Sequence, residues 1–427
     1  MRKLLLLLLL PFLFTYVSAQ ELDTVKMNAI IKMQNQFDSA RLEMQKFHKE
    51  LRQYKLDFIT ENISEINYIK SQLKPQRYSM SPYTQLSRHR NVNSLLATLD
   101  NRPGKIYFNG STVGIVQSIF KDEDNINTAS GSFDLFMYSN LGDNILIFVD
   151  MEAVGGNGPD YHINPFTTLN TDAGSTQSAD GLDRVHILEA WAEYAAFDER
   201  LIITTGKIDL TNYFDINSYA NDENSQFLSN AFVNNASLIA PGNAPGVRVY
   251  ASPIHHISIE AGLSSTENTG DSLFTDIYKI GSIGVSYWEE TSNTFEMRLY
   301  CYQHPSISDS YGYGVSINQS INDKIAIFGR YGQNEDKLSS LHEIKSSWST
   351  GFQYSNKLFE KDLVIGAAYG ISTPYSNSLN NEKNLEIYAR QEINKWIHFS
   401  PIFQQIWNAG GSSNNFSIIG LRTSFEF

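Results

Sequence analysis

The sequence predicts an all-β transmembrane barrel of 16 antiparallel strands, preceded by an α-helical coiled-coil segment. Three observations lead to this fold class. Residues 20–74 contain neither Gly nor Pro and repeat apolar residues at heptad spacing. From residue 113 onward, short segments alternate apolar and polar residues between clusters of Gly, Asn, Asp and Ser. After the first 19 residues, no run of about 20 apolar residues offers a membrane-spanning helix.

Residues 1–19 have the pattern of a secretory signal peptide. Met1–Lys3 carries positive charge, and Leu4–Tyr16 is a mostly apolar core of the length that such a peptide needs, roughly 7–15 residues. Val17–Ala19 supplies the small residues of a cleavage site. We therefore expect export of the chain and removal of residues 1–19, with an uncleaved N-terminal anchor as the alternative.

Residues 20–74 are expected to form a coiled-coil helix that stands in the periplasm. Its apolar seam runs from Ile30 to Phe58 over about four heptads, after which the register shifts, and Pro75 ends the helix. Because a helix cannot bury such a stripe alone, we expect it to pair with copies of itself in a homotrimer and to be a possible link to the cell wall. An isolated amphipathic helix docked on the following domain is the alternative.

Residues 75–112 are expected to be a linker. This stretch contains Pro75, Pro82 and Pro103 and is locally basic. Runs of charge are usually solvated, so a simple connector is one interpretation. Contact with an anionic polymer of the periplasm is the other.

Residues 113–427 are expected to form an outer-membrane β barrel. In the segment around Leu299, Glu296 and Arg298 share one face and aliphatic residues occupy the other. In a membrane barrel the polar face lines a wet lumen and the aliphatic face meets outer-membrane lipid. The barrel must close, because lipid offers no partner for the N–H and C=O groups of a strand edge. The sixteen expected strands lie near 113–120, 131–138, 144–152, 185–197, 200–207, 246–251, 256–263, 281–288, 294–301, 312–318, 325–331, 348–354, 362–370, 384–391, 396–405 and 416–427.

The composition argues against several classes of protein. Acidic residues outnumber basic residues by 46 to 33, which argues against a nucleic-acid partner. The single cysteine, Cys301, excludes an intramolecular disulfide framework and a four-thiolate metal site. The sequence has no Gly-x-Ser-x-Gly elbow and no His-Glu-x-x-His motif, and its nine histidines are scattered. We therefore expect no catalytic residues, no metal site and no cofactor.

Two long polar loops interrupt the strand pattern, at residues 155–183 and 209–243. The second loop mixes aromatic residues with Asn. Long loops within a compact domain tend to be functional. If either loop folded inward, it would narrow the channel.

Three stretches resemble the carbohydrate-selective porin (OprB-type) family. GKIDLTNYFDINSYANDENSQFLSNAFVNN at 206–235 combines a Phe-Asp pair, an Asn-rich turn and a Gln-Phe-Leu helix. EIYARQEINKWIHFSPIFQQIWNAGG at 386–411, followed by IIGLRTSFEF at 418–427, is similar to the last three strands of that family. With PGVRVYASP at 245–253, the likeness covers most of residues 113–427. The resemblance implies a sixteen-strand outer-membrane channel that passes sugars and other small solutes passively.

Charged residues of the inner face are the candidates to line such a pore. An arginine that faced lipid at the bilayer midplane would cost about 2–4 kcal/mol, which favours the lumen. Opposed acids and bases would produce a transverse field that selects ions by sign. The pore-lining candidates are Arg248, Arg298, Arg330, Arg390, Arg422, Glu189, Glu193, Glu260, Glu296 and Glu386. For each of them, a wall structure held by salt bridges is the alternative.

The second loop is the candidate constriction loop. Its candidate residues are Tyr213, Phe214, Asp215, Asn221, Gln226 and Phe227. Among these, the three aromatic rings are expected to offer faces to sugar rings.

The sequence as a whole predicts a porin of the bacterial outer membrane that lets small hydrophilic solutes and ions diffuse passively. Its expected partners are outer-membrane lipid, small sugars or other solutes, and two further copies of the chain. The alternative is a structural anchor that links the outer membrane to the cell wall through the coiled coil.

Overall fold

The computed structural model describes residues 32, 104, 106–121, 124–141, 144–171, 184–197, 200–254, 256–267, 269–270, 275–287, 293–307 and 309–427. The expected signal peptide, nearly all of the expected coiled coil and most of the expected linker lie outside the described residues. The first strand of the barrel begins at Ile106, within the range expected for the linker.

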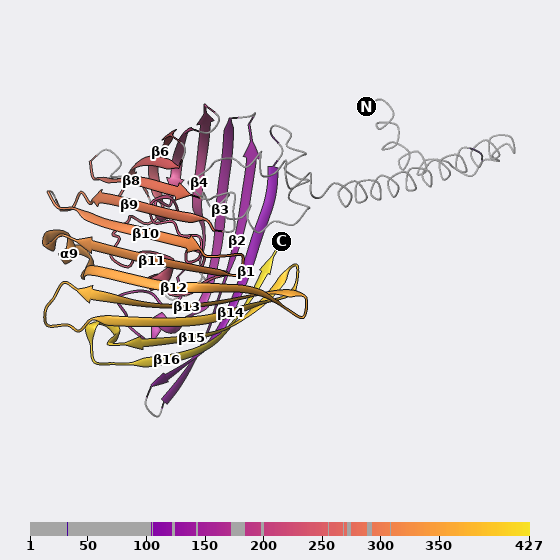
Figure 1. The fold of residues 1–427 in the computed structure, drawn as a ribbon, viewed down its shortest axis with the longest axis vertical. Helices are drawn as coiled ribbons and strands as arrows, with labels where there is room; N and C mark the ends of the chain where they lie inside the picture. Colours follow the sequence, from indigo (N-terminus) through magenta and orange to yellow (C-terminus); the bar gives the residue numbers. More distant parts are fainter. Residues whose placement is uncertain are drawn as a thin grey trace, which may run out of the picture. The chain divides into compact units, whose positions relative to one another are not determined.

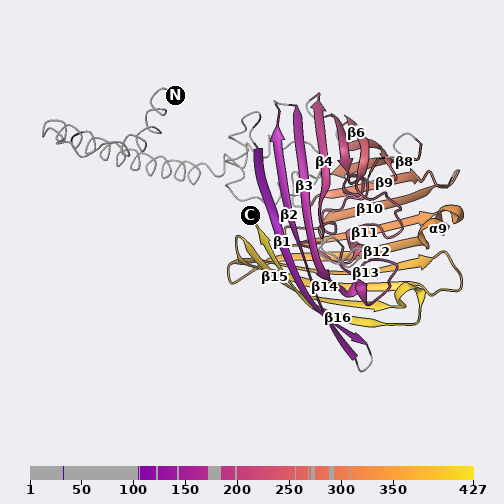
Figure 2. The same cartoon turned by 180° about the vertical axis from the view of Figure 1, so that it is seen from behind.

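Within the described residues, sixteen antiparallel strands close into one barrel (Figures 1 and 2). Each strand pairs with its neighbours in the sequence, and β1 pairs with β16. Because the first and last strands pair, the sheet has no open edge that would expose backbone groups to lipid. The strands are β1 (Ile106–Lys121), β2 (Asp124–Asn140), β3 (Ile145–Asn157), β4 (Arg184–Ala196), β5 (Leu201–Ile208), β6 (Ala244–Ile254), β7 (Ile257–Ser265), β8 (Ile277–Tyr287), β9 (Phe295–Gln303), β10 (Gly312–Ser320), β11 (Ile325–Asn334), β12 (Ile344–Leu358), β13 (Lys361–Pro374), β14 (Glu382–Asn394), β15 (Ile397–Trp407) and β16 (Phe416–Glu426).

All sixteen expected strands are confirmed, and several are longer than the sequence pattern indicated. The ladder of β1 and β2 continues to the pair Lys121 and Asp124, whereas β2 was expected to begin near residue 131. Gly155 and Gly156 belong to β3 rather than to the loop that follows it. A strand can remain hydrogen-bonded beyond the apolar outer band, where the alternation of polarity that marks it in the sequence fades.

Side chains alternate between the two faces of the wall, as the sequence predicted. In β16, Ile419, Leu421 and Phe425 are exposed on the outer face, whereas Arg422 and Ser424 are buried on the inner face. Side chains alternate because successive residues of a strand point to opposite sides. The result is an apolar outer surface of the kind that a barrel embedded in hydrocarbon needs.

The connections between strands carry only short helices in the described part of the chain. α7 (Thr211–Phe214) and α8 (Asn230–Val233) lie between β5 and β6. η1 (Pro159–Tyr161) follows β3, α9 (Asp336–His342) joins β11 to β12, and η2 (Ala409–Gly411) precedes β16. None of the described helices is long and apolar enough to cross a membrane.

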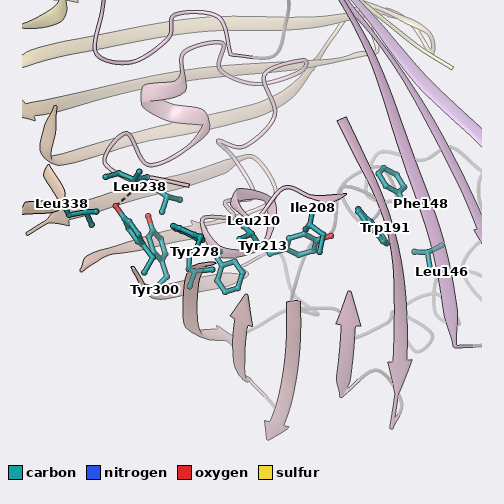
Figure 3. Packing of buried hydrophobic residues seen from close by; sticks show 14 of the residues in the cluster. Leu146, Phe148, Trp191, Ile208, Leu210, Tyr213, Leu238, Tyr278, Tyr300 and Leu338 are labelled. Atoms are coloured by element: carbon teal, nitrogen blue, oxygen red, sulfur yellow. Dashed lines mark hydrogen bonds between the residues drawn. The ribbon is translucent and has the colours of Figure 1, made fainter. Parts of the chain in front are cut away.

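A buried apolar core lies where the β5–β6 connection packs against the wall of the barrel. Figure 3 shows Leu210 and Tyr213 of this connection near Tyr278 of β8. Tyr300 of β9 and Leu238 of the connection belong to the same cluster. The core therefore joins the connection to the wall, and apolar burial helps to hold the connection inside the barrel.

Candidate constriction inside the barrel

The connection between β5 and β6, residues 209–243, is held inside the barrel by the strands that surround it. We call it the inner loop. It begins and ends at the residues that the sequence predicted, because β5 ends at Ile208 and β6 begins at Ala244. It forms hydrogen bonds with side chains of β2, β9, β11, β14 and β16. A segment that reaches wall strands on so many sides must cross the lumen.

Three arginines of the wall fasten the inner loop by donating to its backbone. Arg298 of β9 donates to the carbonyl of Tyr213 at 2.7 Å. Arg422 of β16 donates to the carbonyl of Glu223 at 2.7 Å. Arg330 of β11 donates to the carbonyl of Asp215 at 3.0 Å, and its Nε lies 3.1 Å from the carboxylate of the same residue. All three arginines are buried.

Two glutamates of the wall accept hydrogen bonds from the inner loop. Glu386 of β14 accepts from the amides of Leu228 at 2.7 Å and Ser229 at 2.9 Å, just before α8. Glu296 of β9 accepts from the hydroxyl of Ser218 at 2.7 Å. Amide groups at the start of a helix have no intrahelical partner, so a carboxylate placed there stabilises the turn.

A buried network of charges lies beneath the first turn of the inner loop. Arg248 of β6 pairs with Glu260 of β7 at 2.8 Å and lies 3.8 Å from Glu193 of β4. Glu260 also pairs with Arg298. The guanidinium of Arg248 lies 4.2 Å from the ring centre of Tyr213, in cation–π contact. Because the charges compensate one another, they are stable in a place that water does not reach.

The apolar side chains of the inner loop face the wall and not a solute. Phe227 contacts Phe232, Phe328 and Tyr388, with ring centres 5.0–5.6 Å apart. Phe227, Tyr213 and Phe214 are each 0% exposed. The expectation that these three rings offer faces to sugars is therefore wrong. Alternation and residue type indicated aromatic residues inside the barrel, but only the packing shows that their faces are covered.

The remaining candidates of the inner loop shape its turn. Asp215 accepts from the amide of Asn235 at 2.6 Å, which ties the two limbs of the loop together. Gln226 accepts from the amide of Asn221 at 2.8 Å. Asn221 accepts in turn from Arg330 at 3.1 Å. These polar side chains replace the regular backbone hydrogen bonds that an irregular segment lacks.

The other two pore-lining candidates also lie on the inner face, in different surroundings. Glu189 of β4 is buried and accepts from the amide of Asp209 at 3.0 Å. Arg390 of β14 is half-buried and pairs with Glu426 of β16. Seven of the ten candidates contact the inner loop, namely Arg248, Arg298, Arg330, Arg422, Glu189, Glu296 and Glu386. Glu193 and Glu260 belong to the network of charges around Arg248, and Arg390 pairs with Glu426.

A second segment, which belongs to the other long loop that the sequence predicted, also folds against the inner wall. Residues 159–171, after β3, donate to Glu382 of β14 from the amide of Phe166 at 2.8 Å and from the hydroxyl of Thr167 at 3.1 Å. This segment also bonds to the inner loop. The amide of Thr171 donates to the carbonyl of Leu228 at 2.8 Å. Alternation along β14 is the feature of the sequence that places Glu382 on the inner face.

Asp160 folds the second segment back on itself. It accepts from the amides of Leu169 at 2.7 Å and Asn170 at 3.1 Å. Burial of its carboxyl group raises the pKa of Asp160 from 3.8 to about 6, although these two hydrogen bonds lower it.

The arrangement is suited to positioning a loop and not to bond-breaking chemistry. Among the described residues, no three His, Cys, Asp or Glu side chains gather as metal ligands would. Most of the charged groups are buried, and several of them, such as Arg298, Arg330 and Glu386, are directed at the backbone of the inner loop. Such a site can set the width of a passage and the field across it.

Comparisons with known proteins match this geometry. The family model of the carbohydrate-selective porin, OprB family, matches residues 132–361 and 288–427. The high-pH structure of Pseudomonas putida OprB is similar with a TM-score of 0.62 and 15% identity, over 78% of this chain and 96% of that chain. An uncharacterized protein of Aquifex aeolicus is 25% identical over 252 residues, which is 59% of this chain and 72% of that protein. Porin AaxA of Chlamydia muridarum is 22% identical over 234 residues, which is 48% of each chain.

A closed antiparallel barrel with a long loop fastened inside it defines a porin. The family model covers more than half of this chain, and the chain belongs to the OprB family of carbohydrate-selective porins. It is a channel of the bacterial outer membrane and not an enzyme.

Proposed function

We propose that this porin passes small hydrophilic solutes, carbohydrates among them, by passive diffusion along the inner loop. The observation that carries the proposal is the fastening of this loop across the lumen by Arg298, Arg330, Glu386 and Arg422. A rigid obstacle in a wide barrel excludes large solutes by size and leaves the flow of small ones passive.

The charged residues of the wall then fall into two groups with different roles. Buried charges such as Arg330 and Glu386 hold the inner loop and act on solutes only through their field. Arg390 and Glu296, which are half-buried, are the candidates to meet solutes directly. In this proposal, some of the ten candidates line the pore, as the sequence predicted, and others form a wall structure held by salt bridges, which was the alternative.

Purified protein in planar bilayers tests the proposal. We expect stepwise conductance, and in a swelling assay with sugars of graded size we expect a sharp size limit. A correctly folded barrel without conductance would overturn the proposal and favour the anchor or tether.

Shortening the inner loop tests whether it is the constriction. Replacing residues 216–234 with a four-residue Gly-Ser linker leaves the ends joined, since Asp215 and Asn235 are hydrogen-bonded. We expect the single-channel conductance to rise by about twofold or more, because the obstacle is removed. The matched control replaces the exposed residues 376–378 with the same linker. Unchanged conductance in the shortened porin would mean that the narrowest point lies elsewhere.

The proposal for the assembly of the chain rests on the sequence alone. We propose a homotrimer whose coiled coil, residues 20–74, stands in the periplasm with the cell wall as a possible contact. Its support is the heptad seam, which a single helix leaves exposed.

A further inference from the structure

Arg422 of β16 is a buried cation whose charge is not matched by an ion pair. Its side chain is 0% exposed, and its Nη1 donates to the carbonyl of Glu223. Nε and Nη2 have no hydrogen-bond partner among the described residues, and no carboxylate of these residues forms an ion pair with the guanidinium. Because a charge that is removed from water is costly unless it is paired, this guanidinium is suited to hold an anion.

The acids whose charge acts on Arg422 are engaged elsewhere. Glu386 accepts from two backbone amides at the start of α8. Asp222 accepts from the amides of Asn224 at 2.9 Å and Ser225 at 3.3 Å, within its own turn of the inner loop. Neither carboxylate hydrogen-bonds to the guanidinium. An anion from solution would supply the missing counter-charge.

The unpartnered edge of Arg422 selects the shape of that anion. Nε and Nη2 lie on the same edge of the planar guanidinium, so their N–H groups point in nearly the same direction and can bind two oxygens of one group at once. A carboxylate or a phosphate offers such a pair of oxygens, whereas chloride is a single atom. The edge therefore favours an oxyanion over a halide.

Further unpartnered donors lie beside Arg422 on the inner face. Ser400 of β15 is directly opposite Arg422 in the ladder, and Ser424 is the next inward-facing residue of β16. Ser400 is 1% exposed and Ser424 is 2% exposed, and neither hydroxyl has a hydrogen-bond partner in the described part of the chain. The hydroxyl of Tyr388 on β14 also lacks one there, and its ring centre lies 5.8 Å from Cζ of Arg422. Water could satisfy the hydroxyls, but only an anion also neutralises the guanidinium.

Arg390 of β14 places this group of residues at the edge of the passage. It follows Tyr388 on the inner face of the strand, and its side chain is 14% exposed. Its Nη2 pairs with Glu426, whereas its Nε has no partner among the residues that the structure describes. The amide of Glu426 donates to the carbonyl of Trp396 in the β14–β15 turn. Solvent therefore reaches these residues from the end of the barrel at which β14 and β15 are joined.

We propose that Arg422, Ser400 and Ser424 form a binding site for an oxyanion, which is the carboxylate or phosphate group of a small solute. Arg422 binds two oxygens of this group, and the hydroxyls donate to the same oxygens or to a third oxygen of a phosphate. Arg390 lies at the entrance of the site. Binding depends on the wall alone, whereas delivery of the anion through the passage rests on the proposed porin function.

Isothermal titration calorimetry of the full-length porin, folded in detergent, tests the site with sodium acetate and with inorganic phosphate. The buffer contains no other carboxylate or phosphate, and NaCl keeps the ionic strength constant, so each oxyanion binds in competition with chloride. We expect saturable binding of at least one of the two oxyanions by the wild type. Acetate alone would indicate a site for carboxylates, and phosphate would indicate a site for phosphorylated solutes.

Two variants remove different parts of the site. Arg422→Lys keeps the charge but loses the edge that binds two oxygens, and it should weaken binding by about tenfold or more. The double variant Ser400→Ala, Ser424→Ala keeps Arg422 and should also weaken binding by about tenfold, because hydrogen bonds to an anion are lost. The matched control is the double variant Ser264→Ala, Ser282→Ala. It removes two buried inward hydroxyls of β7 and β8 that also lack partners among the described residues, and it should bind as the wild type does.

The outcomes separate this site from the proposed function. Absence of saturable binding by the wild type would overturn the site, even if the porin conducts KCl in planar bilayers. Equal binding by the wild type, Arg422→Lys and the double variant of Ser400 and Ser424 would overturn it too. Binding without conductance would instead overturn the proposed function and leave the site. A gel mobility that changes on heating shows for each variant that the barrel has folded.

Discussion

At the scale of single residues, the buried charges of this porin act chiefly as fasteners. Arg330 contacts the inner loop at Asp215, Asn221 and Phe232 and is 3% exposed. Desolvation of a charge costs several kcal/mol, and only matched partners repay that cost. Removing one member of such a set therefore costs more than the set contributes to stability when it is complete.

Arg330→Gln should release the inner loop without unfolding the barrel. The variant leaves the buried carboxylate of Asp215 without its cation, which costs about 3–5 kcal/mol. We expect an added protease to cleave the variant faster within residues 209–243. The measurement uses protein folded in detergent, and a gel mobility that still changes on heating shows that the barrel is folded. The control is Arg200→Gln in an exposed turn. Adding Asp215→Asn should recover part of the protection, and equal cleavage of wild type and Arg330→Gln would contradict the assignment.

Asp160 makes the second segment sensitive to pH. Its pKa of about 6 in the folded segment lies above the ordinary 3.8, so the folded segment binds the proton more tightly than the released one. The free energy that holds the segment is therefore greatest below pH 4, falls as the pH rises from 4 to 6 and then stays constant, with a total change of up to about 3 kcal/mol. Hydrogen exchange of residues 161–171, corrected for intrinsic rates, should accelerate through that range. Asp160→Asn should abolish the pH dependence, and a pH-independent wild type would refute it.

At the scale of elements, two segments fold against the inner wall of the barrel, and each has its own acidic anchor on β14. Glu382 holds residues 159–171, whereas Glu386 holds the start of α8. The two anchors are four residues apart on one strand and so share the inner face. The segments also bond to each other through Thr171 and Leu228.

Exchanging one anchor at a time should loosen one segment at a time. Glu386→Gln presents an amide NH₂ group to N–H donors, which costs about 1–3 kcal/mol, and it should accelerate hydrogen exchange in residues 226–233. Glu382→Gln should do the same for residues 163–169, so each variant is the control for the other. Identical exchange profiles in both variants would show that the two segments detach as one unit.

At the scale of the whole molecule, stability of the barrel comes from closure. β16 pairs with β15 on one side and with β1 on the other. No strand edge is then left whose N–H and C=O groups would face lipid without a hydrogen-bond partner. Residues 106–427 thus contain every strand of the described barrel. We therefore expect the barrel to fold without residues 20–74.

Deleting residues 20–74 should therefore separate assembly from folding. We expect the truncated porin to keep its heat-dependent gel mobility and its unit conductance, because the barrel is closed without the deleted part. If the heptad seam assembles the chain, the trimer should weaken on native gels. A trimer of unchanged stability would remove the proposed role of the coiled coil, and loss of barrel folding would contradict independence of the two parts.

The sequence by itself determined the barrel, the order of its strands and the two faces of its wall. A period of two in polarity is a local property, and it identified segments as far apart as 113–120 and 416–427. The same periodicity placed Glu386 and Arg422 on the inner face. Strand ends were less certain, because alternation fades where a strand leaves the apolar band.

Only the tertiary structure decided what the inward residues contact. Phe227 and Tyr213 were candidates to meet sugars, yet they are buried between the inner loop and the wall. The course of the inner loop depends on hydrogen bonds to residues about 85 to 200 positions away, such as Arg298 to Tyr213 and Arg422 to Glu223. Pairings over such distances leave no periodic signal in the sequence, because they exist only once the barrel has closed around the loop.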